Sequence, residues 1–233
     1  MAAETRVRLH GVPKASGDGL TREALRQLVD KDNPVILEIG CNDGSHTRWF
    51  LEEFKNPVIH CFEPDPRAIK RFKENLGENE YVTLHEIALS ASNGTIQFHQ
   101  SDGVPDKHRE LAEGWDLSGS ILEPHKHKEI VPWCKFESVI DIESRTLDTF
   151  MATVNLDTID LVWMDVQGAE YQVLAGATNT LRKIRYIYTE YNNAELYKGQ
   201  KDLLWLVKFL RDFTIKQRFK DDVLFANNAL KPT

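Results

Sequence analysis

PVILEIGCNDGSHT, the stretch from Pro34 to Thr47, decides the fold of this chain. Its first part is apolar and β-branched apart from Glu38, and it predicts a short buried strand over Val35–Ile39. Gly40 and Gly44 then predict a tight turn, and a helix follows. A strand, a glycine turn and a helix in this order build the nucleotide pocket of a doubly wound α/β sheet. The sequence therefore predicts an α/β protein with a ligand site at this turn, although a purely structural turn has the same pattern.

The turn departs from the dinucleotide fingerprint G-x-G-x-x-G, whose middle glycine lets backbone approach a pyrophosphate. Asn42 stands at that middle position, and Glu38 and Asp43 place carboxylates at the turn. Carboxylates beside a pyrophosphate cost Coulomb energy, whereas beside a cationic ligand they are favourable. S-adenosylmethionine carries a sulfonium and an ammonium and no phosphate, so it fits these charges better. We expect Glu38, Gly40, Asn42, Asp43 and Gly44 to bind it.

A second predicted strand, 56–62, ends in the sequence EPDP. Glu63 lies 23 residues after Gly40 (63 minus 40), and βαβ nucleotide sites carry an acidic residue about 20 positions beyond the glycines that binds the ribose hydroxyls. We therefore expect Glu63 to bind ribose, with Pro64 and Asp65 beside it. The alternative is a carboxylate that caps the next helix, but Asp65 can fill that role before a proline.

Composition bounds the class of protein. The 233 residues suit one α/β domain, and 41% hydrophobic with 28% charged residues is ordinary for a soluble globular protein. We find no apolar run long enough for a membrane span and no signal-peptide core at the start. The net charge of -7 argues against a nucleic-acid partner. Cys41, Cys61 and Cys134 show no paired spacing, which predicts reduced thiols in a cytoplasmic protein.

The rest of the chain alternates predicted strands and helices. Residues 1–33 are predicted to form a loose arm followed by one helix, which Thr21 caps. Ser45 is expected to cap the helix after the glycine turn. Residues 34–233 read as a single domain. Further strands are predicted over 81–89, 95–100 (a hairpin strand), 137–144, 159–166 and 185–191, an amphipathic helix over 202–213, and a closing hairpin of 213–219 and 223–227.

Residues 101–135 interrupt this rhythm. The segment is polar, rich in Gly, Pro and His, and holds two tryptophans. A long irregular insertion of this kind is typical of a lid or binding loop. His125, His127 and Glu129 lie close together, so a solvated loop, a substrate or base role for His127, and a metal site all stay open.

With these pieces placed, the chain resembles the FkbM-type S-adenosylmethionine-dependent methyltransferases. The matching segments occur in the family's order over 34–177: VILEIGCNDGSHT, CFEPDPRAIKRFKENL, HEIALSASNGTIQFH, SGSILEP, RTLDTF and IDLVWMDVQGAEYQVLAGA. The glycine motif alone indicates a class I methyltransferase, whereas the RTLDTF and DVQGAE pair points to the family.

The resemblance implies a Rossmann-like, doubly wound seven-stranded sheet, mostly parallel with an antiparallel C-terminal hairpin edge, and helices on both faces. It implies that adenine meets the backbone near Ile87 and Ala88, and usually O-methylation of a hydroxyl on a sugar or other small natural product. Gln167 is a departure, because the family usually has Glu there. Gln cannot act as a base, so we expect Gln167 only to contact the cofactor.

Two carboxylates follow predicted core strands. Asp165 and Glu190 end strands whose carboxyl ends face the ligand crevice, although a carboxylate such as Asp165 can also cap the next helix. Methyl transfer to a hydroxyl needs in-line positioning and a proton acceptor, for which Asp165, Glu190 and His127 are the candidates. Asp165 is also a candidate cofactor contact. With Asn192, the two carboxylates would suit Mg²⁺, which the spacing does not require.

The sequence thus predicts an S-adenosylmethionine-dependent methyltransferase with a small-molecule acceptor. Two alternatives remain: a protein that binds S-adenosylmethionine or a partner without catalysis, and a nicotinamide-dependent oxidoreductase, against which Asn42 and the acidic turn weigh. The acceptor itself cannot be read, because the insertion that would recognise it carries no decodable motif.

Overall fold

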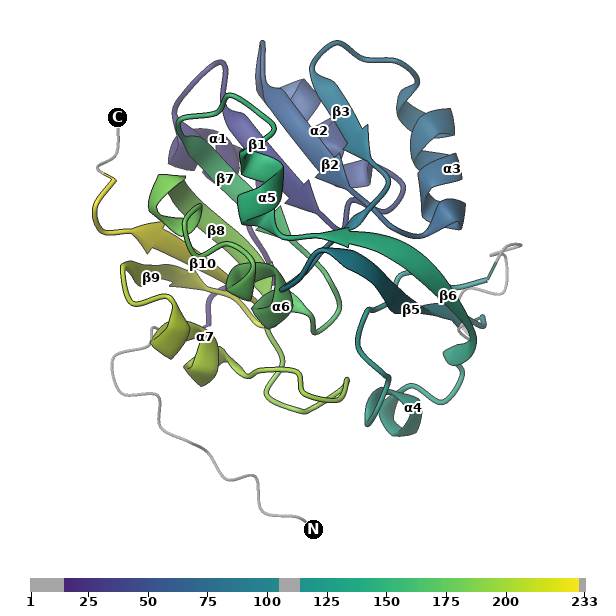
Figure 1. Cartoon of the computed structure of the whole chain (residues 1–233). Helices are drawn as coiled ribbons and strands as arrows, with labels where there is room; N and C mark the ends of the chain where they lie inside the picture. The colour runs from purple at the N-terminus through teal and green to yellow at the C-terminus, as the bar shows by residue number, and fades with distance from the viewer. Residues whose placement is uncertain (1–14, 105–113, 231–233) are drawn as a thin grey trace.

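The computed structural model describes residues 15–104 and 114–230, and the predictions for residues 1–14 and 105–113 lie outside these ranges. Strands and helices alternate along the described chain (Figure 1). The strands are β1 (Val35–Ile39), β2 (Val58–Phe62), β3 (Val82–His85), β4 (Ala88–Leu89), β5 (Gly94–Asp102), β6 (Lys135–Arg145), β7 (Ile159–Met164), β8 (Ile184–Glu190), β9 (Phe213–Arg218) and β10 (Asp222–Asn227). The helices are α1 (Arg22–Val29), α2 (Ser45–Glu53), α3 (Pro66–Leu76), α4 (His127–Ile130), α5 (Leu147–Met151), α6 (Glu170–Ala175) and α7 (Leu203–Phe209), with a 3₁₀ turn at Leu181–Lys183.

Seven of the described strands form one sheet in the order β3-β2-β1-β7-β8-β10-β9. The first five are parallel, whereas β10 runs antiparallel to both β8 and β9. The predicted seven-stranded Rossmann-like sheet with an antiparallel C-terminal edge is therefore confirmed. Strand order reverses between β1 and β7, which makes the gap above these two strands the switch point where such sheets bind ligands.

A second sheet of three strands, in the order β4-β6-β5, lies beside the main sheet. The single strand predicted over 81–89 is wrong, because the chain leaves the main sheet after His85 and pairs with β6 from Ala88. The predicted hairpin strand is also paired differently, since β5 runs antiparallel to β6 and not to the strand before it. Phe98 and Ile142 pack with Ala88 in a separate small core, and this long-range contact selects the pairing.

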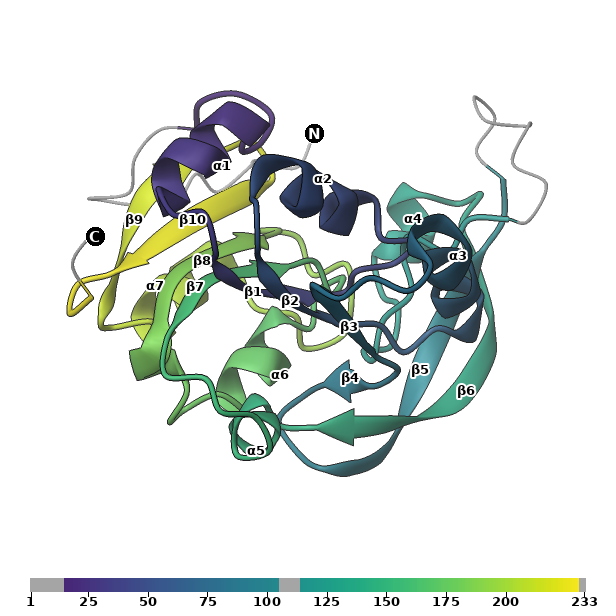
Figure 2. The ribbon, with the colours of Figure 1, turned by 90° about the horizontal axis from the view of Figure 1, so that it is seen from above.

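Helices cover both faces of the main sheet, with α1, α2 and α3 on one side and α5, α6 and α7 on the other (Figure 2). The alternation of side chains along β1 explains this, because Ile36 and Leu37 are both fully buried and join different cores. Leu25 and Val29 of α1 are in the same core as Ile36. The N-terminal helix is thus packed into the core of the sheet.

Among the helix ends predicted from the sequence, one is confirmed and two differ. The Thr21 hydroxyl accepts from the backbone N–H of Ala24 and caps α1, as predicted. Ser45, expected as a cap, is instead the first residue of α2, and Gly44 holds the cap position. The helix predicted over 202–213 is shorter than expected, because the chain turns at Leu210 to begin β9.

The described parts of the insertion are tied to neighbouring segments by backbone hydrogen bonds. Ser120 and His99 exchange two such bonds, of 2.8 and 3.1 Å. The backbone N–H groups of His125 and Lys198 donate to the carbonyls of Leu196 and Glu123, at 2.7 and 2.9 Å. These bonds seat residues 118–127 on β5 and on the loop after β8, and their action as a lid stays a prediction.

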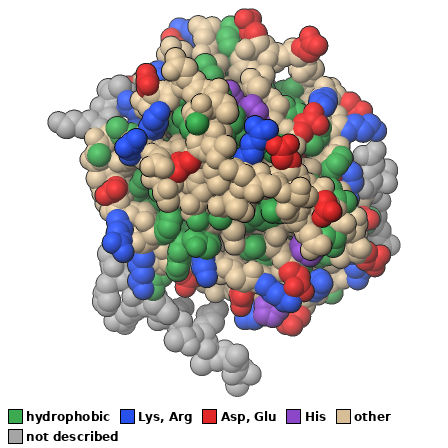
Figure 3. All heavy atoms as spheres, in the orientation of Figure 1, with side chains coloured by type: hydrophobic (Ala, Val, Ile, Leu, Met, Phe, Trp, Pro, Cys, Tyr) green, Lys and Arg blue, Asp and Glu red, His purple; other side chains and the backbone are tan. Residues whose placement is uncertain are grey.

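Charged side chains of both signs are interspersed over the face shown in Figure 3, among the residues drawn in colour. Within residues 15–104 and 114–230, none of the helices has the length and apolar character needed to cross a bilayer.

Candidate active site

A cavity of about 470 Å³ opens at the carboxyl ends of β1, β2, β7 and β8. Its wall includes eight residues that the sequence assigned to the cofactor: Gly40, Asn42, Glu63, Pro64, Ile87, Ala88, Asp165 and Gln167. Glu190, a candidate base, lines the same cavity. The tertiary structure therefore brings together segments that lie up to 150 residues apart (190 minus 40) at the switch point of the sheet.

Gly40 and Asn42 shape the turn after β1, and both have positive φ, of 83° and 44°. A Cβ on Gly40 would lie 1.9 Å from the carbonyl oxygen of Asp165, so only glycine lets the ends of β1 and β7 approach this closely. Asn is among the few other residues that adopt this region readily. The backbone N–H of Asn42 donates to Glu63 Oε2 at 2.9 Å, which closes the turn against the end of β2.

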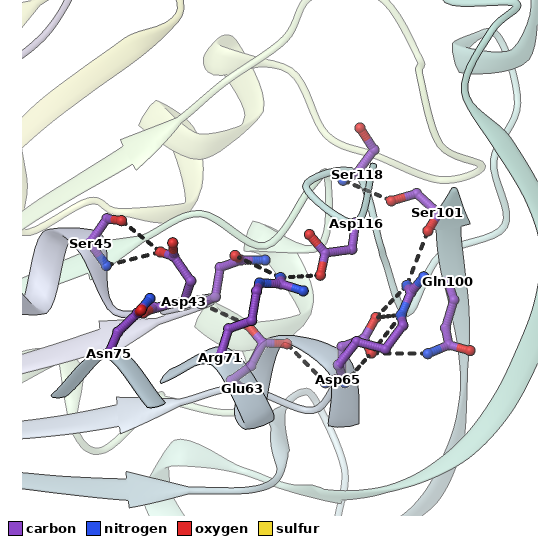
Figure 4. A network of polar contacts seen from close by, with 12 residues as sticks. Asp43, Ser45, Glu63, Asp65, Arg71, Asn75, Gln100, Ser101, Asp116 and Ser118 are labelled. Atoms are coloured by element: carbon purple, nitrogen blue, oxygen red, sulfur yellow. Dashed lines mark hydrogen bonds and ion pairs between the residues drawn. The ribbon is translucent and has the colours of Figure 1, made fainter. Parts of the chain in front are cut away.

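Glu63 is buried and accepts a backbone hydrogen bond at each oxygen, the second from the N–H of Asp65 to Oε1 at 2.9 Å (Figure 4). Burial raises the pKa of Glu63 to about 7, against the lowering effect of these two bonds. Each carboxylate oxygen keeps a second lone pair for a ligand hydroxyl. Asp65 caps α3 by accepting from the N–H of Arg67 at 3.0 Å and does not line the cavity, so Glu63 is not the helix cap.

The sequence suggested that Glu38 presents its charge at the turn. In the structure, Glu38 is instead fully buried beneath the turn. Its Oε2 accepts from the Thr47 hydroxyl, and its Oε1 has no hydrogen-bond partner among the described residues. Burial raises the pKa of Glu38 to about 8. The carboxyl group is therefore mostly protonated at neutral pH unless a cation lies nearby.

Asp43 and Gly44 were also expected at the cofactor, and the structure places both outside the cavity wall. Asp43 Oδ1 accepts from the backbone N–H and the hydroxyl of Ser45, the first residue of α2, at 3.0 and 2.7 Å (Figure 4). A Cβ on Gly44 would lie 2.6 Å from Leu76 and 2.9 Å from Phe72, so glycine lets α2 approach α3. These are packing roles that a glycine motif does not distinguish from ligand contacts.

Asp165, Gln167 and Glu190 form one polar group at the ends of β7 and β8. Gln167 Nε2 donates to Asp165 Oδ1 at 2.6 Å and to Glu190 Oε2 at 3.4 Å. Desolvation raises the pKa of both carboxyl groups, and their mutual repulsion adds to the effect at Glu190. The pair therefore holds a proton more readily than exposed carboxylates do. Binding of a cationic ligand would displace this proton.

The opposite part of the cavity is apolar. Phe62, Ile87, Leu89 and Phe98 lie in its wall beside Ala88. The described residues 115–119 close over this part. Their position is fixed by an ion pair between Arg71 and Asp116 and by a bond of 3.0 Å from the Ser118 N–H to the Ser101 hydroxyl (Figure 4). An aromatic base fits such a surface, whereas a charged group does not.

Two histidines of the insertion, His125 and His127, do not line this cavity. His127 is buried between the rings of Phe136 and Tyr197, with centroids 5.2 and 5.5 Å away. His125 is exposed and lies 3.7 Å from Glu195. Among residues 15–104 and 114–230, no cluster of His, Cys, Asp or Glu has the arrangement of a metal site. The suggested set of His125, His127 and Glu129 is therefore not arranged to hold a metal ion.

Asn192, the third member of the suggested Mg²⁺ set, does not line the cavity wall, and its Oδ1 accepts from the backbone N–H of Ala194 at 2.8 Å.

His46 is a site residue that sequence reasoning missed. It lines the cavity from the first turn of α2, and its ring packs on Trp163, 4.9 Å between centroids. Burial lowers the pKa of His46, which favours the neutral imidazole. In the sequence, only the place of His46 two residues after Gly44 indicated that it could reach the ligand site.

This strand order, with an antiparallel end and an acidic crevice that lacks the pyrophosphate-binding glycine, defines a class I methyltransferase. A family model, the methyltransferase FkbM domain, matches residues 38–220, and the chain belongs to this family. The predicted family and the predicted methyltransferase activity are thereby confirmed.

Two curated relatives are similar over most of the chain. The 2-O-methyltransferase NoeI of Sinorhizobium fredii is 43% identical over 94% of this chain and 90% of its own length. The hexuronic acid methyltransferase AglP of Haloferax volcanii is 23% identical over 87% and 75%. Among solved structures, a precorrin-6y C5,15-methyltransferase from Geobacter metallireducens superposes with a TM-score of 0.45 and 13% identity. The superposition covers 91% of this chain and 92% of that structure's chain.

Proposed function

We propose that the protein binds S-adenosylmethionine in the cavity at the strand ends and transfers its methyl group to a hydroxyl of a small acceptor, most simply a sugar. The observation that carries this proposal is an acidic, partly apolar cavity at the switch point of an FkbM-family chain. Similarity to a 2-O-methyltransferase over almost the whole chain supports O-methylation, and similarity to a hexuronic acid methyltransferase supports a sugar.

The residues present fit this cofactor. Glu63 offers lone pairs to the ribose hydroxyls, and the apolar surface at Ile87 and Ala88 offers a face to adenine. Asp165 and Glu190 offer negative charge to the ammonium and sulfonium.

When bound, S-adenosylmethionine supplies an electrophilic methyl group. The protein must hold the acceptor oxygen in line with it and remove the hydroxyl proton. Asp165 and Glu190 remain candidate bases at the cavity wall, and His46 joins them because a neutral imidazole can accept a proton at neutral pH. We drop His127 from this set, since its position between two aromatic rings keeps it from the cavity.

Calorimetry with S-adenosylmethionine, S-adenosylhomocysteine and NAD tests the cofactor. We expect the first two to bind and NAD not to bind. Measurable NAD affinity without S-adenosylhomocysteine affinity would overturn the proposal and favour an oxidoreductase.

Turnover tests the acceptor class and separates an enzyme from a non-catalytic binding protein. Labelled S-adenosylmethionine is incubated with a panel of methyl glycosides and, in parallel, with non-sugar alcohols and RNA. Transfer to a glycoside hydroxyl supports the proposal, whereas cofactor binding with no transfer to any acceptor supports the binding-protein alternative. We place the protein in a reducing compartment such as the cytoplasm, a proposal that the three buried free cysteines support.

A further inference from the structure

The backbone of Gln167 has a conformation that a non-glycine residue rarely adopts. Its φ is 51°, in the left-handed region, which costs about 1 kcal/mol or more. The Ser120 hydroxyl donates to its carbonyl oxygen at 2.8 Å, so the insertion helps to hold this conformation. Strain of this kind persists where surrounding contacts enforce it, and here it directs the side chain into the cavity wall.

The side-chain amide lies between two carboxylates. Gln167 Nε2 is within hydrogen-bond distance of both Asp165 and Glu190, and Gln167 Oε1 lies 3.5 Å from the Tyr197 hydroxyl. The ionised pair favours this orientation, because the reverse one would place the amide oxygen against two carboxylate oxygens. One amide group thus satisfies acceptors at the ends of two adjacent strands.

Resting on the proposed function, we propose that Gln167 is a positioning residue, whose amide holds Asp165 and Glu190 together as the anionic wall for the cationic end of the cofactor.

The charged groups around this site set how its variants respond to pH. Negative charge that acts on Glu190 also comes from Glu170 on α6, from Asp222 at the start of β10 and from Asp221 just before it. Loss of the amide donor therefore makes the two carboxylates retain their proton to higher pH. A cationic ligand would then bind well only at higher pH.

The test compares Gln167→Met, which keeps the length of the side chain but has no N–H donor, with the wild type. Calorimetry with S-adenosylmethionine at pH 6 to 9 should show at least 10-fold weaker binding at pH 7 and a rise in affinity displaced upward by about one pH unit. Gln27→Met is the matched control, because Gln27 is an exposed residue of α1 that donates to Glu23, outside this cavity.

Gln167→Glu is the second variant, since it replaces the donor by a third carboxylate. We expect the rise in its S-adenosylmethionine affinity with pH to be displaced upward as well, because a third carboxylate adds to the repulsion between Asp165 and Glu190. An unshifted pH dependence in Gln167→Met, even with a lower melting temperature, would overturn the positioning role. Failure of the wild type to bind S-adenosylmethionine would count against the proposed function instead.

Discussion

At the scale of single residues, Asp165 is the group whose role has the clearest chemical test. It lines the cavity at the end of β7 and shares the amide of Gln167 with Glu190. Asp165→Asn removes charge and basicity and keeps the shape. As a base or metal ligand, it should mainly lower kcat, by at least about 100-fold, whereas as a cofactor contact it should mainly raise the Kd of S-adenosylmethionine. Adding EDTA to the wild type separates base from metal, and a variant with normal turnover and affinity would place Asp165 outside the reaction.

His46 is the competing candidate for the base. A substitution of His46 should change turnover and leave cofactor-product affinity nearly unchanged. No hydrogen bond to its ring occurs among the described residues, and Trp49 and Trp163 hold its plane. We expect His46→Gln to lower turnover about 100-fold while S-adenosylhomocysteine affinity stays within about threefold. Ser45→Ala, a neighbour on α2 outside this cavity, is the control. Because burial lowers the pKa of His46, the wild-type rate should fall only at a pH below the ordinary His pKa. A rate that does not fall at any acidic pH at which the protein stays folded would contradict a histidine base.

At the scale of elements, the RTLDTF motif stabilises a turn and does not line the cavity at the strand ends. Asp148 on α5 accepts from the backbone N–H groups of Asn179 and Thr180 and from the Thr180 hydroxyl, at distances of 2.7 to 3.1 Å. These bonds lower the pKa of Asp148 despite partial burial. The motif that identified the family thus joins α5 to the turn before β8, away from the cavity.

Asp148→Ala should destabilise the fold by about 2 kcal/mol, because two backbone donors lose their acceptor. Thermal unfolding should then shift down by about 4–8 °C, with unchanged affinity for S-adenosylhomocysteine. Asp141→Ala, which removes an exposed carboxylate from β6, is the matched control. Since the pKa of Asp148 is lowered, its contribution is present above the ordinary Asp pKa and is lost as pH falls below it. An unchanged melting temperature would mean that water replaces the carboxylate.

At the scale of the whole molecule, buried acids around the cavity make stability depend on pH. Burial raises the pKa of Glu38 to about 8 and those of Glu63 and Glu170 to about 7. The folded state therefore binds more protons than the unfolded state above pH 4.5, and the stability that these groups contribute is lost as pH rises through the folded values. Buried histidines have the opposite sign, since the pKa of His85 is lowered to about 4, but their effect ends near pH 6.5.

We therefore expect the ligand-free protein to lose about 5 °C in melting temperature between pH 6.5 and 8.5. S-adenosylmethionine should reduce this loss, because its positive charge favours the ionised acids, and binding should release protons. Differential scanning fluorimetry with and without ligand measures the first effect, and calorimetry in buffers of different ionisation enthalpy measures the second. Melting temperatures that rise over this pH range would contradict the assignment of buried, protonated acids.

By itself, the sequence determined the strand–turn–helix unit at Pro34–Thr47, the acidic strand end at Glu63 and the family, because hydrophobic period, glycine spacing and motif order are local properties. Only the tertiary structure decided the pairing of β5 with β6, since a strand pattern does not specify its partner. It also decided which motif residues meet the cavity. Glu38 and Gly44 face packed interior and Gln167 reaches two carboxylates from different strands, because burial and contact depend on segments that are distant along the chain.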